Sequence, residues 1–247
     1  MNEIERIKQT YEKRKVERKG QLYDLFGNAA LFHFQQREKA ILQVLARSGI
    51  RCLSDKKILD VGCGAGGVLR DFIKYGANPE NCSGIDLLPD RIETAKHISP
   101  NIDLRRGSAD KLPWNDDCFD IILCFTVFSS ILDEEMRQRI ASEMLRVLKP
   151  EGIILWYDFH MNNPKNPDVR GVKKREIKQL FQNCTFIFQR ITLAPPITRA
   201  LATYSWLLCY FLEEFKFLNT HYLAVIQKPV KRQQMCLTDR GGYAILS

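Results

Sequence analysis

The chain of 247 residues lacks two features that would place it in or across a membrane. It has no apolar run long enough to span a bilayer, since the longest candidate, residues 206–218, is interrupted by Glu213, Glu214 and Lys216. Residues 1–20 carry charges of both signs and lack the apolar core of a secretory signal. We therefore expect a soluble protein.

The sequence also lacks any CxxC pair, although it contains 8 cysteines. Scattered cysteines do not have the ligand spacing of a structural zinc site, so no metal is expected. Several of these cysteines lie inside apolar runs, which is typical of buried free thiols. Free thiols predict a reducing, cytoplasmic location.

A concentrated basic patch is missing as well, despite a formal net charge of +8. The densest basic cluster, residues 13–19, is mixed with Glu12 and Glu17, which is equally typical of a solvated helix with ion pairs three or four residues apart. No aromatic-rich nucleic-acid signature is present. Nucleic acid is therefore not the expected partner.

What the sequence does contain is an alternation of apolar strand-like runs with helical periodicity. Strands are expected at 57–61, 82–86, 102–106, 119–125, 152–159, 185–193 and 222–226. Helices are expected at 1–19, 28–47, 68–75, 89–97, 134–148 and 176–181, with a further apolar helix in an insertion at 194–220. This order predicts an α/β fold with a doubly wound, mostly parallel seven-stranded sheet, forming one domain over 1–228 and leaving a polar tail at 229–247.

The most informative stretch is a glycine-rich turn directly after the first strand. Gly62, Gly64 and Gly66 alternate behind the buried acid Asp60, and an apolar helix follows. Glycines let a ligand approach the backbone closely, and such a strand–turn–helix unit is a common nucleotide site. Asp86 ends the next strand, where a carboxylate can accept both hydroxyls of a ribose.

Further motifs follow this turn in a fixed order. They are Gly107–Trp114, Asp117–Ile122 and Leu145–Gly152, and the last of them joins a helix to the fifth strand. Together with the turn and Asp86, they resemble the motifs of class I S-adenosylmethionine-dependent methyltransferases of the type 11-like group. The resemblance covers residues 58–159. It implies a Rossmann-like class I fold in which an N-terminal helical cap, residues 1–50, covers the cofactor as a lid.

The resemblance also implies a cofactor, S-adenosyl-L-methionine, and the residues that hold it. By position these are Asp60, Gly62, Gly64, Asp86, Leu87, Ser108, Ala109 and Phe125. Ser108 departs from the family pattern, which often has an Asp there to accept from the adenine amine. Phe125 is expected to offer its backbone carbonyl to the ammonium group of the cofactor.

A catalytic base is harder to identify, because Phe128-Ser129-Ser130 stands where related enzymes carry a His pair. Asp158 and His160 alternate along a strand end, so both can face one side, with Asp158 polarising His160 as the base. The alternative is a loop histidine beside a turn-capping Asp158. Arg170 is a candidate for binding a carboxylate or phosphate of the substrate. The alternative is that Arg170 forms an ordinary ion pair with Glu176.

The sequence thus predicts methyl transfer to a small-molecule acceptor, with oxygen as the expected acceptor atom. Asn166–Gly171 and Thr220–Leu223 resemble methyltransferases of sugar or natural-product pathways. Methylation of a macromolecule (RNA or a peptide carboxylate) and a non-catalytic cofactor-binding subunit are the alternatives. The apolar insertion can cap the substrate pocket, form a homodimer face, or dock residues 201–218 on a membrane.

Overall fold

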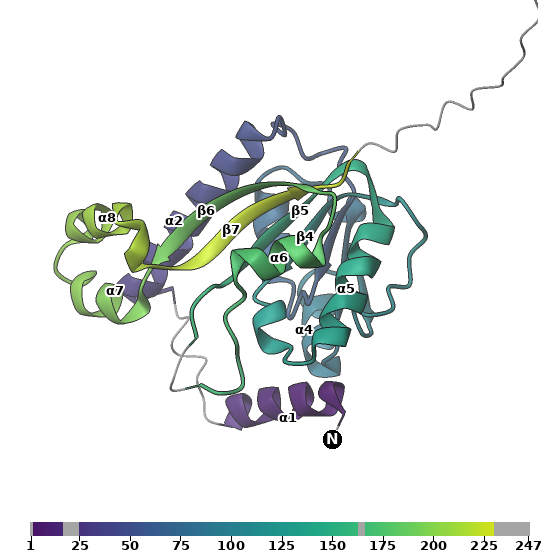
Figure 1. Ribbon diagram of the computed structural model, residues 1–247, viewed down its shortest axis with the longest axis horizontal. Helices are drawn as coiled ribbons and strands as arrows, with labels where there is room; N and C mark the ends of the chain where they lie inside the picture. The colour runs from purple at the N-terminus through teal and green to yellow at the C-terminus, as the bar shows by residue number, and fades with distance from the viewer. Residues whose placement is uncertain (1, 17–24, 163–165, 230–247) are drawn as a thin grey trace, which may run out of the picture.

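One seven-stranded sheet forms the centre of the computed structural model, which describes residues 2–16, 25–162 and 166–229 (Figure 1). The expected tail at 229–247 lies outside the described residues except for its first residue. The strand order is β3-β2-β1-β4-β5-β7-β6, with β7 antiparallel to both neighbours and the remaining pairs parallel. The strands are β1 (Ile58–Val61), β2 (Cys82–Asp86), β3 (Asp103–Arg106), β4 (Phe119–Phe125), β5 (Leu148–Phe159), β6 (Thr185–Leu193) and β7 (Asn219–Gln227). The doubly wound, mostly parallel seven-stranded sheet is confirmed.

Helices cover both faces of this sheet, because the central strands are apolar on both sides. Leu59 and Val61 of β1 belong to one core cluster and Ile58 to the other, as the two-residue repeat of a strand requires. The helices are α1 (Glu3–Val16), α2 (Asn28–Arg47), α3 (Gly67–Lys74), α4 (Pro89–Ile98), α5 (Glu134–Val147), α6 (Lys174–Leu180), α7 (Pro195–Leu201) and α8 (Trp206–Glu214), with short 3-10 turns η2 (Pro79–Asn81), η3 (Phe128–Ser130) and η4 (Lys216–Leu218). The α5 and α6 side is one core layer, and the α2, α3 and α4 side is the other.

The insertion before the last strand differs from the expected single helix. It forms two short helices, α7 and α8, separated by a turn at residues 202–205. The Ser205 side chain accepts a hydrogen bond from the Leu208 amide at 3.2 Å and so caps a new helix. The described ranges contain no helix with both the length and the apolarity to cross a bilayer.

The topology brings distant segments to one edge of the sheet. The carboxyl ends of β1, β2, β4 and β5 lie at this edge, and so does that of β6, since β5 and β6 are both antiparallel to β7. α1 runs along this edge, and α7 and α8 lie at its far end (Figure 1). In open α/β sheets this carboxyl edge is where ligands bind.

Candidate cofactor and acceptor site

The glycine turn between β1 and α3 has the backbone conformation that its sequence predicts. Gly62, Gly64 and Gly66 have φ of 73°, 53° and 77°, in the left-handed region. The amide of Gly62 donates to the Ile85 carbonyl at 2.8 Å, which joins the turn to β2. A Cβ at residue 62 would lie 2.6 Å from Cγ2 of Val127, so this position requires glycine for space as well as for conformation.

Asp86 ties the end of β2 to the same turn. Its Oδ2 accepts from the Gly64 amide and its Oδ1 accepts from the Leu88 amide, both at 2.9 Å. Each carboxylate oxygen keeps a further acceptor position, because an ionised carboxylate offers about four lone-pair sites. The side chain is therefore held in one orientation and still has the capacity to accept from a ligand.

Two buried polar atoms near the turn have no hydrogen-bond partner among the described residues. They are Oδ2 of Asp60, which lies in β1 just before the turn, and Oγ of Ser108. Burial and the nearby Asp86 charge raise the pKa of Asp60 well above its ordinary value. An unsatisfied buried polar group costs about 1–3 kcal/mol, so two of them beside one turn indicate a place built for a polar ligand or for water.

A cavity of about 120 Å³ lies at the carboxyl edge, directly above this turn. Five of the eight predicted cofactor residues line it: Gly62, Asp86, Leu87, Ala109 and Phe125. Asp60, Gly64 and Ser108 do not line it, although Ser108 stands between Gly107 and Ala109, which do. The carbonyl of Phe125 accepts from the Thr126 hydroxyl at 2.7 Å and so already has one partner. Most of the remaining wall is apolar.

α1 lies over the cavity, at the place where the family resemblance implies an N-terminal lid. Ile7 and Tyr11 of α1 line the cavity, and the Arg91 guanidinium lies 4.5 Å from the centre of the Tyr11 ring. Glu3 accepts from the Leu132 amide at 2.6 Å, and the Arg6 hydrogen bond lowers the pKa of Glu3.

The expected pairing of Asp158 with His160 is wrong. Asp158 is buried and accepts from the Ser129 amide at 2.9 Å and from the Phe159 amide at 2.8 Å. Burial raises its pKa to about 6. His160 instead places Nε2 2.8 Å from the Asn219 carbonyl, which can only accept, so Nε2 donates and any base function falls to Nδ1. Burial lowers the pKa of His160.

Arg170 forms the ion pair that the sequence left open as the alternative to substrate binding. Its guanidinium donates to Oε1 of Glu176 at 2.7 Å. The buried Arg137 donates to the same Oε1 atom and to the carbonyls of Phe128 and Ile131. This arginine–glutamate cluster holds the segments after β4 and β5 together. Arg137 has no distinguishing sequence signal, since it reads as one more charged residue on a helix.

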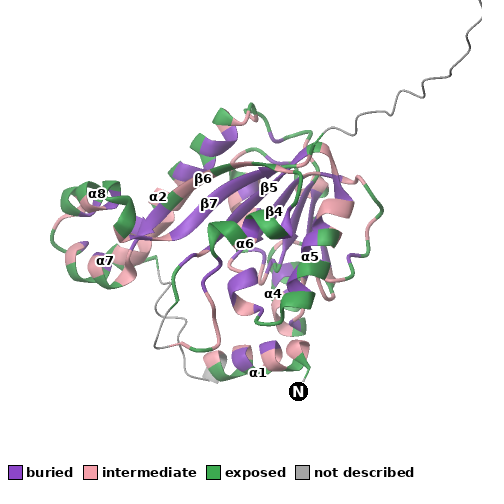
Figure 2. Ribbon diagram, in the orientation of Figure 1, coloured by how far each residue is buried: buried purple, intermediate pink, exposed green. Residues whose placement is uncertain are grey.

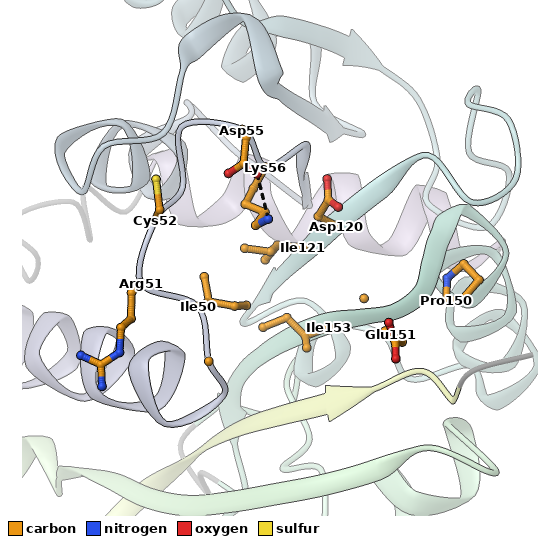
Figure 3. A pocket seen from close by; sticks show the side chains of 12 residues that line it. Ile50, Arg51, Cys52, Asp55, Lys56, Asp120, Ile121, Pro150, Glu151 and Ile153 are labelled. Carbon is orange, nitrogen blue, oxygen red and sulfur yellow. Dashed lines mark hydrogen bonds and ion pairs between the residues drawn. The ribbon is translucent and has the colours of Figure 1, made fainter.

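A second, larger cavity of about 510 Å³ lies at the opposite, amino edge of the sheet (Figure 3). Three of its polar side chains have partners: Lys56 pairs with Asp55 at 3.0 Å, and Asp120 accepts from the Lys57 amide at 2.8 Å. Because ligands of open α/β sheets bind at the carboxyl ends of the strands, the smaller cavity is the candidate site.

Comparison with known proteins agrees with this geometry. Residues 58–152 match the family described as a methyltransferase domain. A phthiotriol/phenolphthiotriol dimycocerosates methyltransferase of Mycobacterium ulcerans is 31% identical over 138 residues, which are 51% of this chain and 47% of that protein. Norajmaline N-methyltransferase of Rauvolfia serpentina is 30% identical over 137 residues, which are 52% of this chain and 45% of that protein.

The chain thus spans about half the length of the curated relatives that it matches. Among solved structures, the YcgJ protein of Bacillus subtilis has a TM-score of 0.53 at 20% identity, covering 76% of this chain and 97% of that one. At this identity the likeness concerns the fold alone. Residues 58–152 of this chain thus match a methyltransferase-domain family, and the chain has the α/β fold of solved S-adenosylmethionine-dependent methyltransferases.

Proposed function

We propose that this protein transfers a methyl group from S-adenosyl-L-methionine to an oxygen atom of a small-molecule acceptor. The observation that carries the proposal is Asp86, whose two carboxylate oxygens are fixed by the Gly64 and Leu88 amides at the wall of the carboxyl-edge cavity. A carboxylate fixed in this way is suited to accept from the two hydroxyls of a ribose.

The surrounding residues fit the rest of this cofactor. Leu87 and the other apolar wall residues suit the faces of an adenine ring, and Ser108 offers an unpaired hydroxyl beside Ala109. Gly62 admits a ligand close to the backbone. When bound, the cofactor supplies a methyl group on a positively charged sulfur, ready for direct displacement. The protein's main contribution is then to hold donor and acceptor in line, which can be worth about 7–11 kcal/mol.

The size of the cavity adds a requirement. Small-molecule sites usually measure roughly 300–1,000 Å³, whereas this cavity measures about 120 Å³. The walls at β1, β2 and β4 belong to the rigid sheet, while α1 contributes Ile7 and Tyr11 from outside it. We therefore expect α1 to shift outward as the cofactor binds while Ile7 and Tyr11 stay in contact with it.

A small-molecule acceptor agrees with the names of the relatives, which give a phthiotriol dimycocerosate and norajmaline as the compounds methylated. An oxygen nucleophile also needs a base near neutral pH, and His160, acting through Nδ1, is our candidate. Its lowered pKa keeps the ring neutral and able to accept a proton.

The test is transfer of a labelled methyl group from S-adenosyl-L-methionine into fractions of a cell extract. We expect label in the small-molecule fraction, made by the wild type and lowered at least about tenfold by His160→Ala, because general-base catalysis contributes about 10²–10⁴-fold. His97→Ala, at an exposed position on α4, is the matched control and should not change turnover. Label confined to the RNA or protein fraction would contradict the proposal of a small-molecule acceptor. Unchanged turnover by His160→Ala would contradict the proposal that His160 is the base.

A non-catalytic cofactor-binding subunit is the second candidate. It is favoured by one observation: Asp158 and His160 are bonded to the backbone, and Asp86 is the only carboxylate among the residues that line the cavity. Binding of S-adenosylhomocysteine without label transfer to any fraction would support this candidate and contradict the enzyme proposal.

A further inference from the structure

Residues 194–218 form a small lobe, the α7–α8 lobe, at the carboxyl edge of the sheet. The chain leaves β6 at Leu193, builds α7, α8 and η4, and re-enters the sheet at Asn219. Figure 1 shows the lobe beyond the end of β6 and β7, on the opposite side of the sheet from α5. It therefore lies outside the core that stabilises the domain.

The inner face of the lobe is firmly seated on α2. The buried Phe32 ring packs against Trp206 and Tyr210, with ring centres 5.6 and 5.2 Å apart. Nε2 of His33 lies 2.8 Å from the Thr198 hydroxyl, and the buried Glu213 accepts from the Thr192 amide at 3.1 Å. The lobe is thus held in a fixed position by specific contacts.

The outer face of the lobe is apolar and open to solvent. Tyr204 is 87% exposed, Leu207 79%, Phe211 61% and Phe217 70%. Leu207 and Phe211 are spaced four residues apart along α8 and so lie on one face of the helix, and the C-cap residue Phe215 follows directly after it. Figure 2 shows that α8 is largely exposed. A helix that is apolar all round needs a cover on its second side.

The exposed charges around this face are mainly basic. Arg199 of α7 and Lys39 of α2 are exposed, and the Lys39 ammonium lies 6.0 Å from the Tyr210 ring. Lys216 is paired with Glu214 at 3.4 Å, whereas Glu213 is buried under the lobe. Three exposed cations thus face one exposed carboxylate among the described residues of the lobe and its border.

We infer that the α7–α8 lobe docks on the surface of an anionic lipid bilayer, with its aromatic and leucine side chains in the headgroup region. Apolar contact and attraction between basic residues and anionic lipid act together in such binding. A second copy of this chain is disfavoured as the cover, because two like-charged faces would meet. The inference rests on the lobe alone and does not depend on methyl transfer.

Vesicle flotation tests this inference on the full chain. The probes are vesicles of phosphatidylcholine alone and of equal parts phosphatidylcholine and phosphatidylglycerol. We expect binding to the anionic vesicles, weaker binding to the neutral ones, and at least about a tenfold loss in Leu207→Ser/Phe211→Ser, since each side chain would withdraw from an apolar environment. Ile98→Ser, at a similarly exposed apolar position on α4, is the control and should bind as the wild type does.

Affinity for S-adenosylhomocysteine, measured on the same samples, shows whether each variant is folded and tests the cofactor site separately. Arg199→Glu should weaken binding to anionic vesicles without changing binding to neutral ones. Absence of vesicle binding, or binding that the double substitution leaves unchanged, would overturn the inference. A concentration-dependent dimer that the double substitution abolishes would also overturn it, in favour of a second copy.

Discussion

The two cavities at opposite edges of the sheet differ in a way that identifies the functional one. The amino-edge cavity is the larger, at about 510 Å³, but Asp55, Lys56 and Asp120 on its wall are already hydrogen-bonded within the protein. The carboxyl-edge cavity is only about 120 Å³, yet Asp60 and Ser108 beside it have buried oxygen atoms without partners. The position at the carboxyl edge together with these unpaired atoms, rather than volume, favours the smaller cavity as the ligand site.

The largest expected effect on cofactor affinity comes from replacing one carboxylate residue at the carboxyl edge by alanine, with the same replacement at the amino edge as the control. Asp86→Ala should weaken binding of S-adenosylhomocysteine by at least about 100-fold, because two hydrogen bonds to a charged group, each worth about 1.5–3 kcal/mol, are lost. Asp120→Ala removes a carboxylate that lines the amino-edge cavity and should change affinity less than about twofold. Isothermal titration calorimetry measures both. Equal losses of affinity in the two variants would contradict the assignment of the cofactor site to the carboxyl-edge cavity.

The carboxyl group of Asp158, which is buried and hydrogen-bonded, contrasts with the unpaired Asp60. Its effect on stability should depend on pH. Its folded-state pKa of about 6 exceeds the ordinary 3.8, so the folded protein holds this proton more tightly than the unfolded chain does. Raising the pH from about 4 to about 6 should therefore cost the wild type roughly 1–3 kcal/mol of stability relative to Asp158→Asn, which cannot titrate. Denaturant unfolding at several pH values measures this difference. A difference that is constant from pH 4 to pH 7 would contradict the raised pKa.

Gly49 at the amino edge and Gly62 at the carboxyl edge allow the cost of a left-handed backbone to be distinguished from the cost of a steric contact. Gly49, at the amino-edge cavity, has φ of 80° with open space around a Cβ, whereas a Cβ at Gly62 meets Val127 at 2.6 Å. Gly49→Ala should cost about 1–2 kcal/mol for its left-handed backbone, and Gly62→Ala at least about 1 kcal/mol more for the contact. Only Gly62→Ala should lower cofactor affinity. If Val127→Ala does not recover part of the Gly62→Ala loss, the contact is not its cause.

The smallest effect is expected from the α1 side chain above the cavity. Tyr11→Ala removes part of the wall and should weaken binding of S-adenosylhomocysteine by about three- to tenfold, consistent with losing one partly buried aromatic contact. Tyr11→Phe keeps the ring and should bind within about twofold of the wild type, since the hydroxyl contact to Ser130 is long, at 3.3 Å. Tighter binding by Tyr11→Ala would mean that α1 only obstructs the site.

Local sequence signals were sufficient to predict the sheet and the part of the site that is formed by the glycine turn and Asp86. The strand runs ending at Asp60–Val61 and Asp86 are continuous and buried, and the turn needs glycines, so both could be read residue by residue. The place of α1 over the cavity was implied only by the family resemblance, because α1 is held there by long-range bonds from Glu3 and Arg6 to residues 130–133. The Asp158–His160 pairing failed for a similar reason. Alternation put both on one side, but the distant Ser129 amide binds Oδ2 of Asp158 and the distant Asn219 carbonyl binds Nε2 of His160.

Hydrogen exchange of the full chain, with and without S-adenosylhomocysteine, tests the choice between the two edges most directly. Our account predicts slower exchange at residues 62–66 and 86–88 and in α1, with residues 49–56 and 150–153 unchanged. Slower exchange confined to residues 49–56 and 150–153, or no change anywhere at saturating ligand, would contradict it.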